Sequence, residues 1–197
     1  MCHQPHGKSS FIKSLLLFIA VQCVASAPVF SADMYAAARE ELIQLRKEDQ
    51  AIRQKGNLTP ADIIEMRAID LRTSERLKEI IKQIGWPTTA TVGKDASSAA
   101  FLIAQHAAHD RPLMDLAFSN IEAGYKAGTV PGVHYALMYD RLKMFDGLPQ
   151  KYGTQIQSDA KSCEVYKLED PAKVDTYRRE VGLMMDLESY KNKLCGG

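Results

Sequence analysis

The 197-residue sequence has little of what marks several broad protein classes. It carries only four cysteines, which excludes a disulfide-dense scaffold. Its formal net charge is +1, so it gives no support for a surface that coats nucleic acid. Repeats and low-complexity runs are absent, while 46% of the residues are hydrophobic and 25% are charged. This composition is typical of a folded globular protein and argues against disorder.

Signature motifs of common enzymes are also missing. The sequence has no G-x-S-x-G serine elbow, no H-E-x-x-H zinc motif and no phosphate-binding loop. Beyond the first 32 residues, no cysteine has a histidine close to it in the sequence. The sequence therefore names no reaction, and function has to be inferred from the placement of its polar residues.

The first 32 residues predict a signal peptide rather than part of the fold. Residues 1–13 carry Lys8 and Lys13 and no acid, and residues 14–25 are almost wholly apolar. A basic segment, a short apolar segment and then small residues are typical of a secretory signal peptide. The apolar run has about 12 residues, whereas a membrane span needs roughly 20, so a retained anchor is the weaker interpretation.

Cleavage of this segment near Ser31 or Ala32 would leave a single domain covering 33–197. Two lysines leave with the signal peptide, so totals of 25 basic and 24 acidic residues become 23 and 24, a net charge of −1. About 165 residues can bury one proper core. We expect this mature domain in the periplasm or outside the cell, with no membrane attachment after cleavage.

Only two cysteines remain in the mature chain, Cys163 and Cys195. In an oxidising compartment this pair predicts a disulfide, with two independent free thiols as the alternative. Neither cysteine has a second Cys or His at zinc-binding spacing, so a zinc site built on them is not expected.

Cap and stop signals predict a mostly α, single-domain bundle of about six or seven helices. The clearest start is Thr59-Pro60, with Asp62 completing a capping-box pattern, and the clearest stop is Gly85. The short connection before Thr59 predicts an antiparallel hairpin of the first two helices. Residues 150–168 lack helical periodicity and predict a loop or short hairpin. The expected helices cover 33–55, 60–84, 95–109, 112–128, 131–145, 171–182 and 186–194, with Asp33, Asp95, Asp110 and Asp170 as expected caps.

Three carboxylates fall in apolar stripes of these helices: Asp49, Asp70 and Asp140. A buried carboxylate is costly unless it is paired or hydrogen-bonded, so each needs a partner. Arg53 and Arg141 lie close to two of them in the sequence. One interpretation is structural, with Asp49 paired to Arg53 and Asp70 capping a nearby element. The other is a buried polar pocket inside the bundle.

The expected third helix is unusual because residues 96–109 contain no Lys, Arg, Asp or Glu. A helix that is apolar all round is normally central and buried. Its only large polar residues are Gln105, His106 and His109, and His106 shares a face with packed residues. It is either a hydrogen-bonded core histidine or an acid–base group. The spacing of the two histidines is weak support for a metal with Asp110 or Asp140, so we expect no metal site and no cofactor.

Residues 150–155 place a phenol, a hydroxyl and carboxamides around Gly153. With Gly153 as a flexible point, Tyr152, Thr154 and Gln155 suit a loop that faces a ligand, and an ordinary polar turn is the alternative.

Several short motifs together resemble an uncharacterised bacterial family, a domain of unknown function. The resemblance implies one domain over about 40–190 and no particular reaction. The chain departs from the family pattern at Ala108, where an acid is expected, and at Ser74, where Asn is expected. The motifs are Asp49-Gln50 with Arg53, Gly85-Trp86-Pro87-Thr88, Gln105-His106-Ala107, Asp140-Arg141, Gln150 with Tyr152-Gly153-Thr154-Gln155, and Val174-Asp175 with Arg178 and Gly182-Leu183.

The sequence favours an exported binding module with a buried polar pocket for a small polar ligand or another protein. The residues expected to contact the ligand are Asp49, Arg53, Gln105, Arg141, Tyr152, Thr154 and Gln155.

The alternative is a small hydrolase-like or lyase-like enzyme. In that case His106 is the general acid or base, and Asp70 or Asp140 orients it. Arg53 or Arg141 then holds an anionic group of the substrate. A purely structural buried network is the third possibility.

Overall fold

A computed structural model describes residues 28–56, 58–158 and 162–196. In these residues the chain forms eight helices and one two-stranded sheet, so the expected mostly α domain is confirmed. Residues 1–27, which make up most of the predicted signal peptide, lie outside the described residues. Within the described part of the chain, no helix is both long and apolar enough to cross a membrane.

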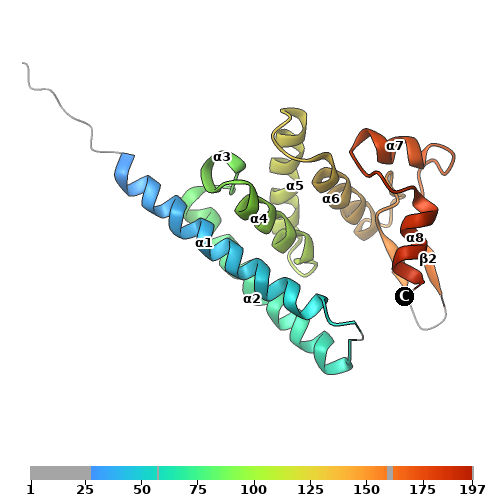
Figure 1. Cartoon of the computed structure of the whole chain (residues 1–197), viewed down its shortest axis with the longest axis horizontal. Helices are drawn as coiled ribbons and strands as arrows, with labels where there is room; N and C mark the ends of the chain where they lie inside the picture. The colour runs from blue at the N-terminus through green and yellow to red at the C-terminus, as the bar shows by residue number, and fades with distance from the viewer. Residues whose placement is uncertain (1–27, 57, 159–161, 197) are drawn as a thin grey trace, which may run out of the picture.

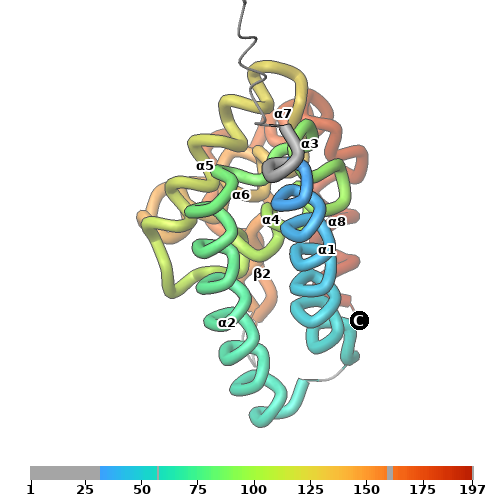
Figure 2. Tube along the Cα trace, turned by 90° about the vertical axis from the view of Figure 1, so that its left-hand side faces the viewer, coloured from blue at the N-terminus to red at the C-terminus, as the bar shows by residue number. Residues whose placement is uncertain are grey.

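Two long helices, α1 (Pro28–Arg53) and α2 (Pro60–Ile84), form the predicted antiparallel hairpin. They run side by side in both views of the molecule (Figures 1 and 2). The start of α2 is the expected capping box, because the Thr59 side chain accepts from the Asp62 amide and Asp62 accepts from the Thr59 amide. Gly85 ends the helix with a φ of 74°, a conformation that favours glycine.

The central helix is α4 (Lys94–His106), which packs against α1, α2, α5 and α6. Helix α5 covers Arg111–Lys126 and α6 covers Gly132–Phe145. Small residues such as Ala99 and Ala104 are fully buried, so neighbouring helices can approach α4 closely. After the exposed Lys94 and Asp95 in its first turn, the rest of α4 carries no Lys, Arg, Asp or Glu, and this has the predicted cause: it lies in the middle of the core.

The C-terminal part lies at the right-hand end of the molecule in Figure 1, opposite the start of α1. Strands β1 (Ile156–Ser158) and β2 (Cys163–Val165) pair antiparallel, so the predicted loop or hairpin contains a short hairpin. Two short helices follow, α7 (Val174–Glu180) and α8 (Leu187–Cys195), and α8 packs on both strands.

Helix boundaries differ from the expectations at several places. Helix α1 begins at Pro28 rather than after a cap at Asp33. A one-turn helix, α3 (Thr89–Val92), was not expected; it forms because Thr88 caps it in a capping box with Thr91. Gly93, not Asp95, is therefore the cap residue of α4.

Near the other helix ends, one expected cap is confirmed and one is wrong. Asp110 caps α5 as predicted, because its side chain accepts from the Leu113 amide. The turn before Asp110 ends α4 at His106 rather than at the expected His109. Asp170 does not cap α7. Its carboxylate accepts from Ala172 in a turn, which delays the helix start to Val174.

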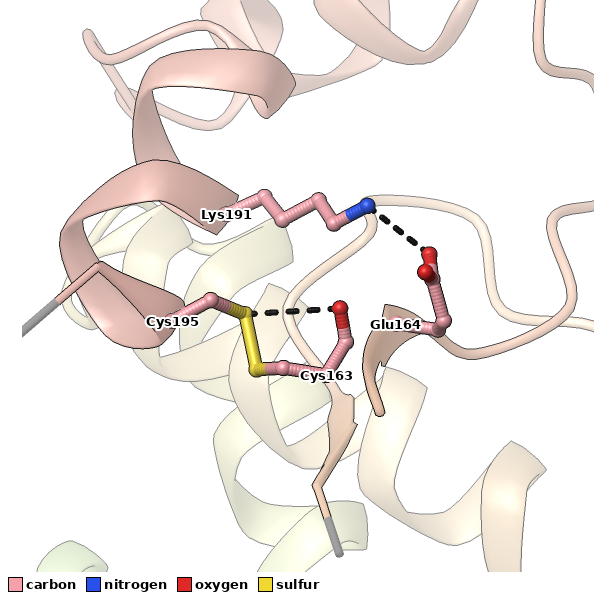
Figure 3. The surroundings of a disulfide bond; sticks show 4 residues. All are labelled: Cys163, Glu164, Lys191 and Cys195. Atoms are coloured by element: carbon pink, nitrogen blue, oxygen red, sulfur yellow. Dashed lines mark hydrogen bonds and ion pairs between the residues drawn. A yellow bond between two sulfur atoms is a disulfide. The ribbon is translucent and has the colours of Figure 1, made fainter. Parts of the chain in front are cut away.

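The predicted disulfide is confirmed. Cys163 at the start of β2 and Cys195 at the end of α8 are bonded at an S–S distance of 1.99 Å (Figure 3). Beside it, the Lys191 ammonium group lies 2.8 Å from the Glu164 carboxylate, so a second link joins α8 to β2 (Figure 3).

Removing this disulfide should lower the stability of the domain. The two cysteines are 32 residues apart. A cross-link over that separation stabilises the folded state by about 2–4 kcal/mol, because it lowers the conformational entropy of the unfolded chain. We expect the double variant Cys163→Ser, Cys195→Ser to show that loss in urea unfolding. Adding a reductant should destabilise the wild-type domain and leave the double variant unchanged. An identical response of both proteins to the reductant would contradict this expectation.

Candidate functional site

The Asp140 carboxylate is completely buried and holds the loop that follows α6. It accepts hydrogen bonds from the amides of Lys151 at 2.8 Å, Tyr152 at 3.1 Å and Thr154 at 3.0 Å. The Thr154 hydroxyl donates a further bond at 3.0 Å. Burial raises the pKa of Asp140, and these four donors oppose that rise by stabilising the charged form. The acid is therefore satisfied by loop amides and not by an arginine.

Gln150 closes the same loop from within. Its side-chain amide donates to the carbonyls of Gln155 and Tyr166, each at 2.9 Å, and its side-chain oxygen accepts from the Gln155 amide at 2.8 Å. The side chain is fully buried, so these bonds replace all of its contact with water. Gln150 thereby joins both ends of the loop to the segment that follows β2.

Two residues of the C-terminal helices hold the loop carbonyls. Arg178, which is 1% exposed, donates to the Tyr152 carbonyl at 2.8 Å, and its guanidinium lies over the Tyr190 ring. The Tyr190 hydroxyl donates to the Thr154 carbonyl at 3.1 Å. Gly153 has a φ of 63°, and a Cβ there would meet a Leu187 side-chain carbon at 2.6 Å. The loop is thus held by hydrogen bonds and packing on both sides.

Arg141 follows Asp140 on α6 and contacts the outer side of this loop. Its Nε donates to the Gln155 side-chain oxygen at 3.1 Å, and its Nη1 donates to the Gln105 carbonyl at 2.8 Å. No carboxylate of the described residues lies within 4.0 Å of its guanidinium. Burial lowers the pKa of Arg141, and the nearby charge of Arg53 lowers it further. The guanidinium is nevertheless always charged in proteins. Its direct partners are neutral oxygens, and the charge of Asp70 attracts it from farther away.

The second part of the site is an Asp–His pair between α1 and α4. His106 Nδ1 lies 2.8 Å from an oxygen of Asp49, whose carboxylate is fully buried. Burial alone would raise the pKa of Asp49, but the hydrogen bond and charge of His106, together with Gln50 and Arg53, hold it below its ordinary value. Nε2 of the same ring makes no hydrogen bond to the described residues, and the side chain is 16% exposed.

Arg53 connects this pair to α2. Its guanidinium lies 3.3 Å from Asp49 and 2.7 Å from Asp70, so it bridges the two acids. Asp49, Asp70 and His106 each offer one atom that could ligate a metal ion, and these three atoms all lie within 4.8 Å of one another. Arg53 already contacts both carboxylates and supplies one positive charge between them.

Most of the predicted site residues come together in one continuous network. The Asp49–His106 pair and the Arg141 contacts meet at α4, because Arg141 bonds the carbonyl of Gln105, the neighbour of His106. Asp49, and not Asp70 or Asp140, is the residue that orients His106, which corrects the earlier expectation. Asp70 instead pairs with Arg53.

Thr154 and Tyr152 were expected to contact a ligand, but their side chains contact other residues of the domain. The Thr154 hydroxyl donates to Asp140 and accepts from the Gln155 side chain. The ring of Tyr152 packs edge-on against Tyr135 and Tyr139. Their contribution is to fix the loop.

Sequence reasoning did not select Gln150, Arg178 and Tyr190 as site residues, although all three hold the loop. One signal was available for Arg178. It lies four residues after Val174 and three before Val181, both buried, so it occupies the apolar face of α7. The roles of Gln150 and Tyr190 depend on loop carbonyls that no sequence periodicity reveals.

Residues 36–195 match a protein family described as Family of unknown function (DUF6624). The chain belongs to this family. The resemblance inferred from its motifs is therefore confirmed, and nearly the whole described domain lies within DUF6624. No curated protein and no solved structure matches the chain.

The low pKa of Asp49 predicts how stability depends on pH. Because its pKa is lower in the folded state than the ordinary 3.8, its charge stabilises the domain above that value. This contribution is lost as the pH falls from 3.8 through the folded-state pKa. We expect Asp49→Asn to be less stable than wild type at pH 7 and to lose less stability on acidification, measured by urea unfolding at a series of pH values. Equal acid losses in both proteins would argue against the pairing with His106.

Proposed function

We propose that this domain is exported and binds a small anionic ligand at the surface formed by Arg53, His106 and Arg141. The observation that supports the proposal is the guanidinium of Arg141, whose hydrogen bonds go to two neutral oxygens. Arg53 repels it, and Asp70 attracts it without direct contact. A partly buried charge that no opposite charge contacts directly is costly for the folded protein. A carboxylate or phosphate group bound here would balance that charge.

The chemistry of the three side chains suits an anion. Guanidinium groups bind carboxylate and phosphate oxygens through paired N–H donors, and such charge-assisted bonds are stronger than neutral ones. His106 adds a ring nitrogen, Nε2, that is free of hydrogen bonds to the described residues. Gln155 is 4% exposed and fixed by its loop, so it keeps Arg141 in place before any ligand arrives. A preformed site loses less entropy on binding.

Export is part of this proposal. The signal-peptide pattern of the first 32 residues supports it. The Cys163–Cys195 disulfide fits it too, because disulfides persist in oxidising compartments and are rare in the cytosol. The periplasm or the medium is therefore the proposed location, and the ligand would be a small molecule there or an acidic group of a protein partner.

Anion binding should depend on Arg141. In isothermal titration calorimetry at low ionic strength, with inorganic phosphate and citrate as probes, we expect saturable binding to the wild type. Loss of one charge-assisted contact in Arg141→Gln should weaken it by about tenfold or more. Arg39→Gln is the matched control, because exposed Arg39 also donates to a neutral carbonyl, that of Val92, outside the site. Equal affinities of wild type and Arg141→Gln, or no binding of either probe, would contradict the proposal.

A hydrolase-like or lyase-like enzyme is the second candidate, and the Asp49–His106 pair favours it. A histidine that is oriented through Nδ1 by a buried carboxylate and keeps Nε2 accessible has the arrangement of a general acid or base. In that case His106→Gln would abolish turnover while phosphate and citrate still bind. If the domain only binds, the same variant changes affinity alone.

A further inference from the structure

A second hollow lies apart from the polar network, between the turn at Trp86 and α5. It is a cleft of about 670 Å³, within the size range of ligand sites. One wall is formed by Trp86 with the α3 residues after it, and the opposite wall by the C-terminal half of α5 and the turn that follows. None of the residues that line it belongs to the network around Asp49 and Arg141.

The lining of this cleft carries no charge. A quarter of all residues of the chain are charged, yet the cleft has only indole, hydroxyl, amide and small apolar groups. Ala90, Ala123 and Ala127 leave the space open where larger side chains would fill it. A charged ligand loses hydration when it binds, and a site without ionic groups offers no opposite charge to compensate for that loss. An uncharged ligand is therefore favoured.

Polar groups without protein partners face this cleft. The hydroxyls of Thr89 and Ser97 make no hydrogen bond to the described residues. Asn120 donates through its side-chain nitrogen to the Leu116 carbonyl, which leaves its side-chain oxygen as a free acceptor. Because a purely apolar ligand would desolvate these groups without replacing their hydrogen bonds, a ligand with its own hydroxyl groups is favoured.

Trp86 supplies a rigid apolar wall. Its position is fixed by Gly85, which has a φ of 74°, and by Pro87, which is buried. The indole also packs partly against the main core. A large aromatic face next to hydroxyl and amide groups suits a ring that has an apolar face and a polar edge.

The cleft continues into a smaller hollow of about 90 Å³ that shares Trp86, Thr89 and Ser97 with it. This hollow ends at His134, whose ring stacks on Phe101 with centroids 4.0 Å apart. Burial lowers the pKa of His134, which favours the neutral form of its ring. The exposed Lys94 is the one permanently charged residue of its lining.

We propose that this cleft binds a neutral saccharide of one or two sugar rings. The C–H face of a pyranose ring packs on the Trp86 indole, while its hydroxyls bond to Thr89, Ser97 and Asn120. This site is independent of the proposed anion site, because the two share no residue.

The single tryptophan of the sequence makes the test direct. Trp86 is the only source of tryptophan fluorescence, so a change in emission reports on this cleft. The probes are glucose, N-acetylglucosamine, cellobiose and maltose, with glucuronate and glucosamine as charged counterparts. We expect at least one neutral probe to give a saturable change, and the charged counterparts to bind about tenfold more weakly or not at all.

Variants locate the binding. Ala123→Leu fills the cleft and should weaken the neutral saccharide by about tenfold or more, whereas Ser119→Leu, one turn earlier on α5 and outside the lining, should not. Thr89→Ala removes a free hydroxyl from an exposed position and should also weaken binding, which keeps a test available if Ala123→Leu does not fold. The proposal is overturned if no neutral probe gives a saturable change up to about 10 mM. Equal binding of charged and neutral probes, or wild-type affinity in the folded cleft variants, also overturns it.

Discussion

The buried carboxylate of Asp140 organises the polar half of this domain. It accepts hydrogen bonds from three loop amides and one hydroxyl, and these bonds fix the conformation of residues 150–155. The next residue, Arg141, points to the outer side of that loop and bonds Gln155. Two adjacent residues of α6 therefore contact the same loop in different ways. Asp140 holds the loop through its backbone amides, and Arg141 is held by the Gln155 side chain of that loop. The geometry of the candidate site depends on this acid, although Asp140 itself is inaccessible to a ligand.

Charge balance explains the rest of the network. Asp49 and Asp70 share Arg53, and Asp49 also holds His106, so each acid near α1 and α2 has a cationic or polar partner. Arg141 has polar partners but no carboxylate of the described residues within 4.0 Å, and it lies near another arginine. Asp49, Asp70, Arg53 and Arg141 carry two negative and two positive charges, but Arg53 contacts both acids and Arg141 contacts neither. That asymmetry is the physical basis for an anion as the ligand, and it stands apart from the uncharged cleft at Trp86.

Local signals predicted what local interactions determine. The sequence predicted both the capping box at Thr59 and the central position of the helix with the charge-free run from residue 96, because caps and apolar faces are set by neighbouring residues. Partners were harder to predict. The bond between Asp49 and His106 joins residues 57 apart, and Asp140 is satisfied by loop amides, which leave no pattern in the sequence. An acid in an apolar stripe therefore indicated a polar interaction correctly but did not indicate with which group.

Hydrogen exchange at the amides of Tyr152 and Thr154 tests the central claim most directly. Both amides donate to the buried Asp140 carboxylate, in a loop that is not part of a helix or sheet. If this acid fixes the loop, both should exchange about as slowly as core amides of α6, through opening of the domain rather than of the loop alone. Exchange near the rate of an unprotected amide would show that the loop opens locally, and would contradict the account.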